Sequence, residues 1–266
     1  MHSSEIAPET GQLKVSGFDL PYQWWGNKYD VPVIFFHEFG RDVGDYAPVC
    51  AALVHQGYSC LNLSLPLHHQ LNSEPEFFCT SDFSRKLTET LAHNGFSEYI
   101  LVAHTFGARM ALPLATARPE VLKKIILIAP EGFTPRDDQW LKMAKFPLIS
   151  HLLDHSDWLA NFYATLYKPG LSGIKGVNIP GLFRSFLRMY PEIDLYYNGT
   201  MGKLYTIDCP VELIWGEQDR ENPFHVAAEV KQHFRFPHIH PLKNCGHNPM
   251  IENPELLIRT IIKILR

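Results

Sequence analysis

The clearest chemical signal in the sequence lies between an apolar run that ends at His104 and a helical pattern that begins at Phe106. The residue between them is Thr105, whose hydroxyl could act as a nucleophile. A sharp strand-to-helix turn presents such a hydroxyl, and it needs small residues two positions before and two after. Ala103 and Gly107 meet that need. The five residues therefore predict a nucleophile on a tight turn.

Two further residues supply what a hydroxyl nucleophile needs. Asp219 follows the apolar run 211–216, and His247 follows Gly246 in the loop after the run 238–242. A histidine within hydrogen-bond reach takes the proton of the hydroxyl as it attacks. An aspartate fixes the tautomer of that histidine and stabilises the imidazolium. The order nucleophile, acid, histidine predicts a catalytic triad built at the ends of three strands.

Each of these residues also has a structural interpretation. Thr105 could be a helix N-cap, a role that threonine fills well. Asp219 could be a helix N-terminal acid before Pro223. A single histidine such as His247 could lie on the surface or in the core. The catalytic interpretation is preferred because the three residues follow one another in the required order and context.

The elements that must position these residues can be predicted from hydrophobic periodicity. Runs rich in Val, Ile, Phe, Tyr and Trp predict eight strands, at residues 12–17, 22–27, 31–37, 58–65, 99–104, 124–129, 211–216 and 238–242. A polar link at 18–21 predicts that the first two strands form an antiparallel hairpin. Helical patterns occupy residues 45–56, 80–93, 106–117, 223–234 and 254–265. This alternation predicts an α/β fold, with a mostly parallel sheet and helices on both faces.

The alternation stops between the sixth and seventh strands. Residues 134–206 instead hold amphipathic pieces rich in aromatic residues. A structureless loop of that length is improbable in a compact domain. We therefore expect a helical cap at 134–206, inserted into a core formed by residues 1–133 and 207–266. Some of the aromatic side chains should pack the cap on the core, and others should line an apolar pocket.

The composition excludes several classes of protein. Of the 266 residues, 45% are hydrophobic and 20% are charged, as in ordinary globular proteins. The net charge of −4 gives no basic excess for a nucleic acid. No apolar stretch approaches the roughly 18–20 residues of a membrane span. The five cysteines are widely spaced and the N-terminus lacks a signal-peptide pattern, so we expect a cytoplasmic location. The oligomeric state stays open.

Histidine is plentiful, and some pairs could bind metal. His151 and His155 are at helical spacing with Asp154 between them, but no third ligand completes a recognisable frame. A solvated helix face is the preferred interpretation. His238 and His240 share one face of a strand and are interpreted as surface residues. We expect no metal and no cofactor.

From about residue 11 to its C-terminus the sequence resembles the α/β-hydrolase superfamily, in its capped esterase and carbon–carbon-bond hydrolase branch. Each matching motif is short, but the combination in this order is specific. The matching pieces are His37-Glu38-Phe39-Gly40, Leu65-Pro66, the turn around Thr105, Trp215-Gly216-Glu217-Gln218-Asp219 and Gly246-His247.

The resemblance implies an α/β-hydrolase fold, with an eight-stranded mostly parallel sheet and an inserted helical cap. It implies a small apolar or acyl-bearing substrate. It also implies roles for named residues: Thr105 as nucleophile, Asp219 as acid, His247 as base, and the backbone N–H groups of Phe39 and Phe106 as the oxyanion hole. The surrounding elbow and pocket residues are His37, Glu38, Gly40, His104 and Gly107.

Two positions depart from the family pattern. Thr105 stands where the family has serine, and its β-branched side chain is unfavourable at the positive φ of such a turn. Glu38 stands where the family usually has glycine. A carboxylate pointing into the site would repel an oxyanion unless it were protonated or paired.

Three functions follow from these observations. The first is a hydrolase of carboxylic esters or related acyl compounds that uses a Thr-His-Asp triad. The second is an impaired hydrolase that binds a small apolar ligand without turnover. The third keeps His247 as a general base without a covalent intermediate, as in a lyase, a hydration or a cofactor-free oxygenation.

Overall fold

The computed structural model of the protein describes residues 7–15, 18–27, 31–39, 41, 43–65, 80–133, 147–167, 179–181, 183–184, 187, 195 and 199–266. Its strands form one eight-stranded sheet in the order β1-β2-β4-β3-β5-β6-β7-β8. The strand bounds are β1 Glu9–Val15, β2 Phe18–Trp25, β3 Pro32–Phe36, β4 Ser59–Leu63, β5 Tyr99–His104, β6 Leu122–Ile128, β7 Val211–Gly216 and β8 Pro237–Leu242.

The sheet is mostly parallel. Only the pairings of β1 with β2 and of β2 with β4 are antiparallel, and β4, β3, β5, β6, β7 and β8 run parallel. The central strands are buried along almost their whole length, because helices cover both faces. The predicted fold class is confirmed.

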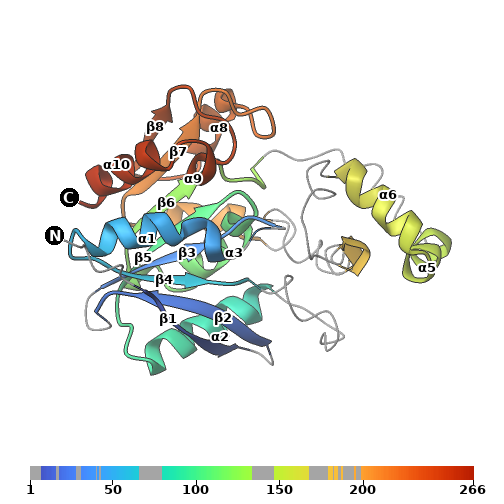
Figure 1. Ribbon diagram of the computed structural model, residues 1–266, viewed down its shortest axis with the longest axis horizontal. Helices are drawn as coiled ribbons and strands as arrows, with labels where there is room; N and C mark the ends of the chain where they lie inside the picture. Colours follow the sequence, from blue (N-terminus) through green and yellow to red (C-terminus); the bar gives the residue numbers. More distant parts are fainter. Residues whose placement is uncertain are drawn as a thin grey trace.

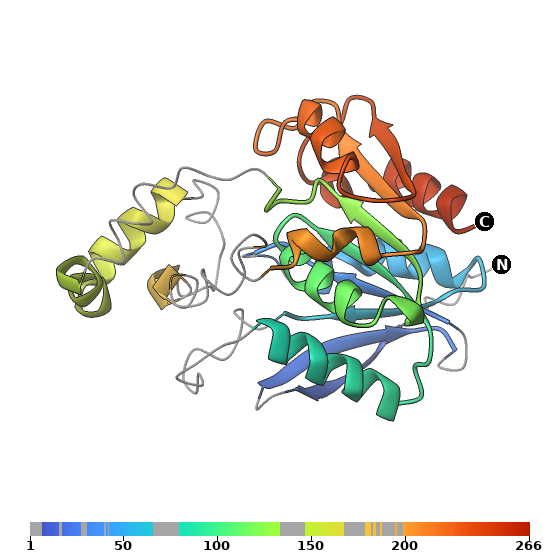
Figure 2. The same ribbon diagram turned by 180° about the vertical axis from the view of Figure 1, so that it is seen from behind.

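Helices cover the two faces in separate groups. The bounds are α1 Ala47–Val54, α2 Thr80–His93, α3 Phe106–Ala117, α5 Pro147–His155, α6 Asp157–Tyr167, α8 Ala227–Lys231, α9 Pro249–Glu252 and α10 Pro254–Leu265. Side chains of α1 and α10 pack in one core layer, and side chains of α2, α3 and α8 pack in the other. Figure 1 shows α1 and α10 in front of the sheet, and Figure 2 shows α2 and α3 in front of it.

Local sequence explains where these helices lie. In α10, Leu257, Ile261 and Ile264 recur at helical spacing and are buried. Asn253 caps the helix, since its side chain accepts a hydrogen bond from the N–H of Leu256 at 3.1 Å. Pro254 follows at the first helical position, where its missing N–H removes no hydrogen bond.

The first hairpin differs from the prediction at its turn. The hairpin is antiparallel as expected, but residues 18–21 belong to β2 and are not the link. Leu20 is buried and pairs with Leu13, so the apolar pairing of the two strands includes this segment. Its neighbours Asp19 and Pro21 are the residues that favoured a link in the sequence. Packing outweighs residue type at this point, so that β1 ends at Val15 and β2 already begins at Phe18.

Helices α5 and α6 fall in the segment expected to form the cap. Figure 1 shows α5 and α6 away from the sheet and from the helices that flank it. Arg184 binds the carbonyl of Leu153 at 2.7 Å and the carboxylate of Asp157 at 2.8 Å, and so ties a neighbouring segment to both helices. Residues 134–146 lie outside the described residues. The boundaries of the cap at 134 and 206 stay a prediction.

No described helix combines the length and the hydropathy that crossing a membrane requires. The described cysteines Cys50, Cys60, Cys209 and Cys245 are free and buried. Burial raises the pKa of the Cys209 thiol to about 11, which keeps that thiol protonated.

A close approach at the end of β7 gives the first prediction. A Cβ on Gly216 would lie 2.1 Å from the carbonyl oxygen of Gly246 and 2.4 Å from that of Cys245. We expect Gly216→Ala to lower the free energy of unfolding by about 1–3 kcal/mol or more, because two backbone segments must separate. Chemical denaturation measures this. Gly202→Ala is the control, since its Cβ would meet nothing within 4 Å. Equal stability of the two variants would contradict the prediction.

Candidate active site

Thr105 lies on a sharp turn between β5 and α3. Its φ is 47° and its ψ is −105°, a strained conformation for a β-branched residue. Its N–H donates to the carbonyl of Ile128 at 3.0 Å, which fixes the turn to the neighbouring strand β6. A Cβ on Gly107 would lie 2.4 Å from the carbonyl oxygen of Phe36, so this position needs glycine. The positive φ predicted for Thr105 is confirmed.

The hydroxyl of Thr105 does not cap helix α3. Its Oγ1 instead lies 3.2 Å from Nε2 of His247. The other ring nitrogen, Nδ1, lies 2.8 Å from Oδ2 of Asp219. All three residues are buried. The structure thus brings together the three residues that the sequence predicts as a triad, with the oxygen–nitrogen distances of hydrogen bonds.

The carboxylate of Asp219 is enclosed by the loop after β7. Its Oδ1 accepts hydrogen bonds from the N–H groups of Glu221 at 2.9 Å and Asn222 at 2.8 Å. The Asn222 side chain then donates to the carbonyls of Ala129 and Pro130, at 3.0 and 2.9 Å. These bonds fix the orientation of the carboxylate and attach its loop to the end of β6.

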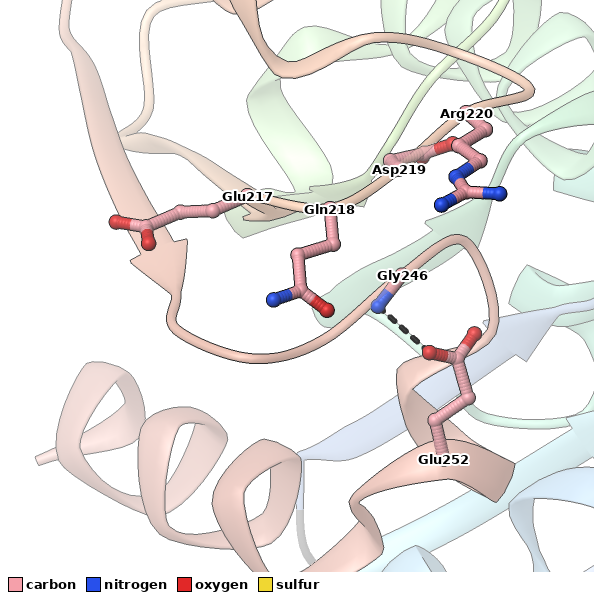
Figure 3. A pocket seen from close by; sticks show the side chains of 6 residues that line it. All are labelled: Glu217, Gln218, Asp219, Arg220, Gly246 and Glu252. Atoms are coloured by element: carbon pink, nitrogen blue, oxygen red, sulfur yellow. Dashed lines mark hydrogen bonds between the residues drawn. The ribbon is translucent and has the colours of Figure 1, made fainter.

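The loop that carries His247 is held by Glu252 from α9. The two carboxylate oxygens of Glu252 accept from the N–H of Gly246 at 2.6 Å and from the N–H of Asn248 at 2.8 Å. A Cβ on Gly246 would lie 2.7 Å from that carboxylate, so a glycine is needed for the contact. Figure 3 shows the bond to Gly246, and both residues help to line a groove of about 630 Å³. Sequence reasoning missed Glu252, because nothing but its position five residues after His247 marks it.

That groove lies between the segments that follow β7 and β8. It is lined by Glu217, Gln218, Asp219, Arg220, Gly246 and Glu252. In Figure 3 the side chain of Glu217 points away from Gly246. The carboxylate of Asp219 has no exposed surface. The groove therefore borders the loops of Asp219 and His247, and its lining includes neither Thr105 nor His247.

His37 orders the loop after β3. The N–H of Leu65 donates to its Nε2 at 2.9 Å, and its Nδ1 lies 2.8 Å from the carbonyl oxygen of Glu38. Because the Leu65 N–H can only donate, Nε2 accepts, and Nδ1–H donates to the carbonyl. His37 is therefore a neutral bridge between two loops. This arrangement fixes the backbone from which the Glu38 side chain leaves.

The Glu38 side chain points into the site. Only 2% of the residue is exposed, and its Oε1 lies 3.2 Å from Nε2 of His247.

The aromatic rings of Phe39 and Phe106 contact each other, with centroids 5.4 Å apart. The oxyanion role of their N–H groups stays a prediction. Gly40 lies outside the described residues.

His104 packs beneath His247. Its Nε2 lies 2.9 Å from the carbonyl oxygen of His247, and the ring centroids are 5.2 Å apart. Burial, and secondly the charge of His247, hold the pKa of His104 well below its ordinary value. The ring is therefore neutral, and Nε2–H donates to the carbonyl. His104 thus supports the backbone of His247.

Three of these residues could in principle hold a metal ion. Ligand atoms of Glu38, His104 and His247 lie within 4.8 Å of one another. Both ring nitrogens of His247 already face oxygen partners, and Nε2 of His104 faces a carbonyl. An ion would have to displace these hydrogen bonds, so the set fits proton transfer better than coordination.

The other histidine pairs are explained by local bonds. Nδ1 of His155 lies 2.8 Å from the carbonyl of His151, within helix α5. His240 and His238 both face the buried Glu212 of β7, with nitrogen–oxygen distances of 2.6 and 3.6 Å. Sequence reasoning missed this partner, which neighbouring strands bring beside both histidines.

Known proteins resemble the chain in sequence and in fold. A family model described as the alpha/beta hydrolase family matches residues 31–260. The hydrolase YugF of Bacillus subtilis (strain 168) is 21% identical, over 96% of this chain and 97% of its own. The pimeloyl-[acyl-carrier protein] methyl ester esterase of Nitrosospira multiformis is 28% identical, over 63% of this chain and 68% of its own. A thermophilic esterase from Thermogutta terrifontis superposes with a TM-score of 0.73 at 15% identity, covering 97% of this chain and 98% of that one.

The Glu252 contact gives the second prediction. We expect Glu252→Ala to speed amide hydrogen exchange at Gly246 and Asn248 and to lower the free energy of unfolding by about 1 kcal/mol, because two N–H groups lose a charged acceptor that is partly screened by solvent. Exchange mass spectrometry and thermal melting measure these effects. Glu255→Ala, at an 85% exposed side chain, is the control. Unchanged exchange at Gly246 and Asn248 would show that Glu252 does not hold the loop.

The buried neutral His104 gives the third prediction. The unfolded chain gains a proton on this residue below about pH 6.5, and the folded chain does not. The contribution of His104 to the free energy of unfolding is therefore complete above that pH and is lost as the pH falls. Between about pH 6 and pH 5, the wild type should lose up to about 1.4 kcal/mol more stability than His104→Gln. Denaturation curves at several pH values measure this, with the exposed His93→Gln as control. Parallel curves for wild type and His104→Gln would refute it.

Proposed function

Because the chain belongs to the alpha/beta hydrolase family, we propose that it hydrolyses carboxylic esters or related acyl compounds, with Thr105 as nucleophile. The observation that carries the proposal is the continuous chain from Oγ1 of Thr105 through both nitrogens of His247 to Asp219, with distances of 3.2 and 2.8 Å. This chain can move one proton away from the hydroxyl and stabilise the positive charge that results.

The reaction follows from that geometry. Oγ1 of Thr105 attacks the acyl carbon while Nε2 of His247 takes its proton, and Asp219 stabilises the imidazolium through Nδ1. The negative charge that develops on the carbonyl oxygen needs N–H donors, and we assign this role to the backbone N–H groups of Phe39 and Phe106. Each such donor contributes roughly 3–4 kcal/mol to the transition state. His247 then protonates the leaving alcohol, and a water molecule hydrolyses the acyl-enzyme by the same steps.

The extra methyl group of Thr105 makes this nucleophile slower than serine. It adds a branch at Cβ on a residue already at a φ of 47°, which restricts χ1. The hydroxyl still reaches the histidine, so the strain is compatible with attack. The expected enzyme is a slow esterase whose nucleophile is correctly placed.

The relatives support an ester substrate. The Nitrosospira relative is named for a methyl ester of an acyl-carrier-protein-bound acid. In the segment predicted to be the cap, α6 carries exposed apolar side chains one helical turn apart, at Trp158, Phe162 and Leu166. An apolar acyl chain suits such a surface better than a sugar or a phosphate does.

Substitutions at the nucleophile give the fourth prediction. Thr105→Ala should reduce hydrolysis of short p-nitrophenyl esters by roughly 10³-fold or more, because no covalent intermediate can form. Thr105→Ser should raise the rate by roughly tenfold, since the methyl group is removed while the base and acid remain. Fluorophosphonate labelling followed by mass spectrometry should place the adduct on residue 105.

His247→Ala separates the covalent route from the alternative in which the histidine acts alone. Loss of activity in both Thr105→Ala and His247→Ala supports covalent attack. Activity that survives Thr105→Ala but not His247→Ala would replace it with general-base catalysis on water. Wild-type protein and Thr105→Ser that neither label nor turn over would refute the esterase proposal.

A further inference from the structure

One nitrogen of His247 faces two oxygens. Nε2 lies 3.2 Å from Oγ1 of Thr105 and also 3.2 Å from Oε1 of Glu38. Only 2% of Glu38 and 4% of Thr105 are exposed, so little water can separate these groups. A nitrogen in an imidazole ring has one position in the ring plane, which holds either a proton or a lone pair. The hydroxyl and the carboxylate therefore compete for that single position.

The contact between Nε2 and Glu38 requires a proton. Nδ1–H of His247 donates to Asp219, so a neutral ring would present a bare lone pair at Nε2. A charged carboxylate placed 3.2 Å from a lone pair, out of water, is repelled. The repulsion disappears when one proton lies between the two atoms, on either of them. In both cases the lone pair that should accept the Thr105 proton is occupied.

Carboxylates lie against both nitrogens of the His247 ring. Asp219 faces Nδ1, Glu38 faces Nε2, and Glu221 from the loop after β7 lies 3.9 Å from Nε2 with half of its side chain exposed. His104, which packs against the ring from β5, is neutral. Three carboxylates thus lie around one imidazole ring, and two of them are within hydrogen-bond distance of its nitrogens.

We propose that Nε2 of His247 carries a proton that it donates to Glu38, and that this contact holds the site in a latched resting state, in which the Thr105 hydroxyl cannot be deprotonated. Removal of that one proton to solvent leaves Nε2 with its lone pair and lets it accept the proton of Thr105. Glu38 is a positioning residue, since it acts on the reaction through His247. The inference concerns regulation of the same site, and its activity arm rests on the esterase function proposed above.

The proton itself can be observed without any turnover. In ¹⁵N-labelled wild-type protein at about pH 7, both ring nitrogens of His247 should resonate as protonated nitrogens, and His247→Gln identifies the signals by their loss. In Glu38→Gln, which keeps the shape of the side chain but removes its charge, Nε2 should shift to the range of an unprotonated nitrogen. Glu217→Gln, an exposed residue on the loop after β7, is the control. A neutral His247 in the wild type, or no shift in Glu38→Gln, would overturn the proposal.

Activity is tested with Glu38→Ala, which removes the carboxylate that competes with the Thr105 hydroxyl for Nε2 of His247. Hydrolysis of p-nitrophenyl esters and fluorophosphonate labelling of Thr105 should both rise by roughly tenfold or more. A fall in both rates, with the ring proton lost as expected, would overturn the latch, because Glu38 would then be needed for the reaction. A proton shift in Glu38→Gln without labelling or turnover in any variant would uphold the shared proton and refute the esterase.

Discussion

The site depends on one imidazole ring that distant parts of the chain must reach at the same time. His247 lies 28 residues from Asp219, 142 from Thr105 and 209 from Glu38, and each of these residues contacts the ring. Such contacts form only if the carboxyl ends of β3, β5, β7 and β8 lie at one edge of the sheet. The parallel strand order provides that edge, and the bonds of Glu252 and Asn222 then fix the loops at ångström precision. The fold and the site are therefore linked through a small number of buried polar contacts.

Much of this arrangement could be predicted from the sequence, because it rests on local rules. A continuous apolar run such as 99–104 predicts a strand buried on both faces, and β5 has those bounds. The periodicity of 80–93 and its Asn94-Gly95 end predict a helix, and α2 has the same bounds. The three residues of the predicted triad could be located because Thr105 lies in a small-residue turn after a strand, and Asp219 and His247 lie in loops that follow strands. The boundaries failed where packing outweighed residue type, as at Leu20 in β2.

The direction of individual side chains could not be predicted. The sequence shows that Glu38 replaces a glycine, but the path of its side chain depends on His37, Leu65 and the ring of His247. Leu65 lies 28 residues from His37, and His247 lies 209 residues from Glu38, so no short window of sequence contains these contacts. The same holds for Glu212 of β7, whose carboxylate faces His238 and His240 on the next strand. Local patterns predict elements, whereas polar partners are decided by tertiary structure.

The two departures from the family pattern act on the same atom. Thr105 holds its hydroxyl in place through a strained φ, and Glu38 places a buried carboxylate against the same nitrogen. Both features are unfavourable for folding by themselves, and both are tolerated because β5, β6 and the loops around them are firmly packed. Since both side chains compete for one lone pair, the effects of changing them cannot be additive. The chemistry of Thr105 therefore has to be judged together with the proton held between Glu38 and His247.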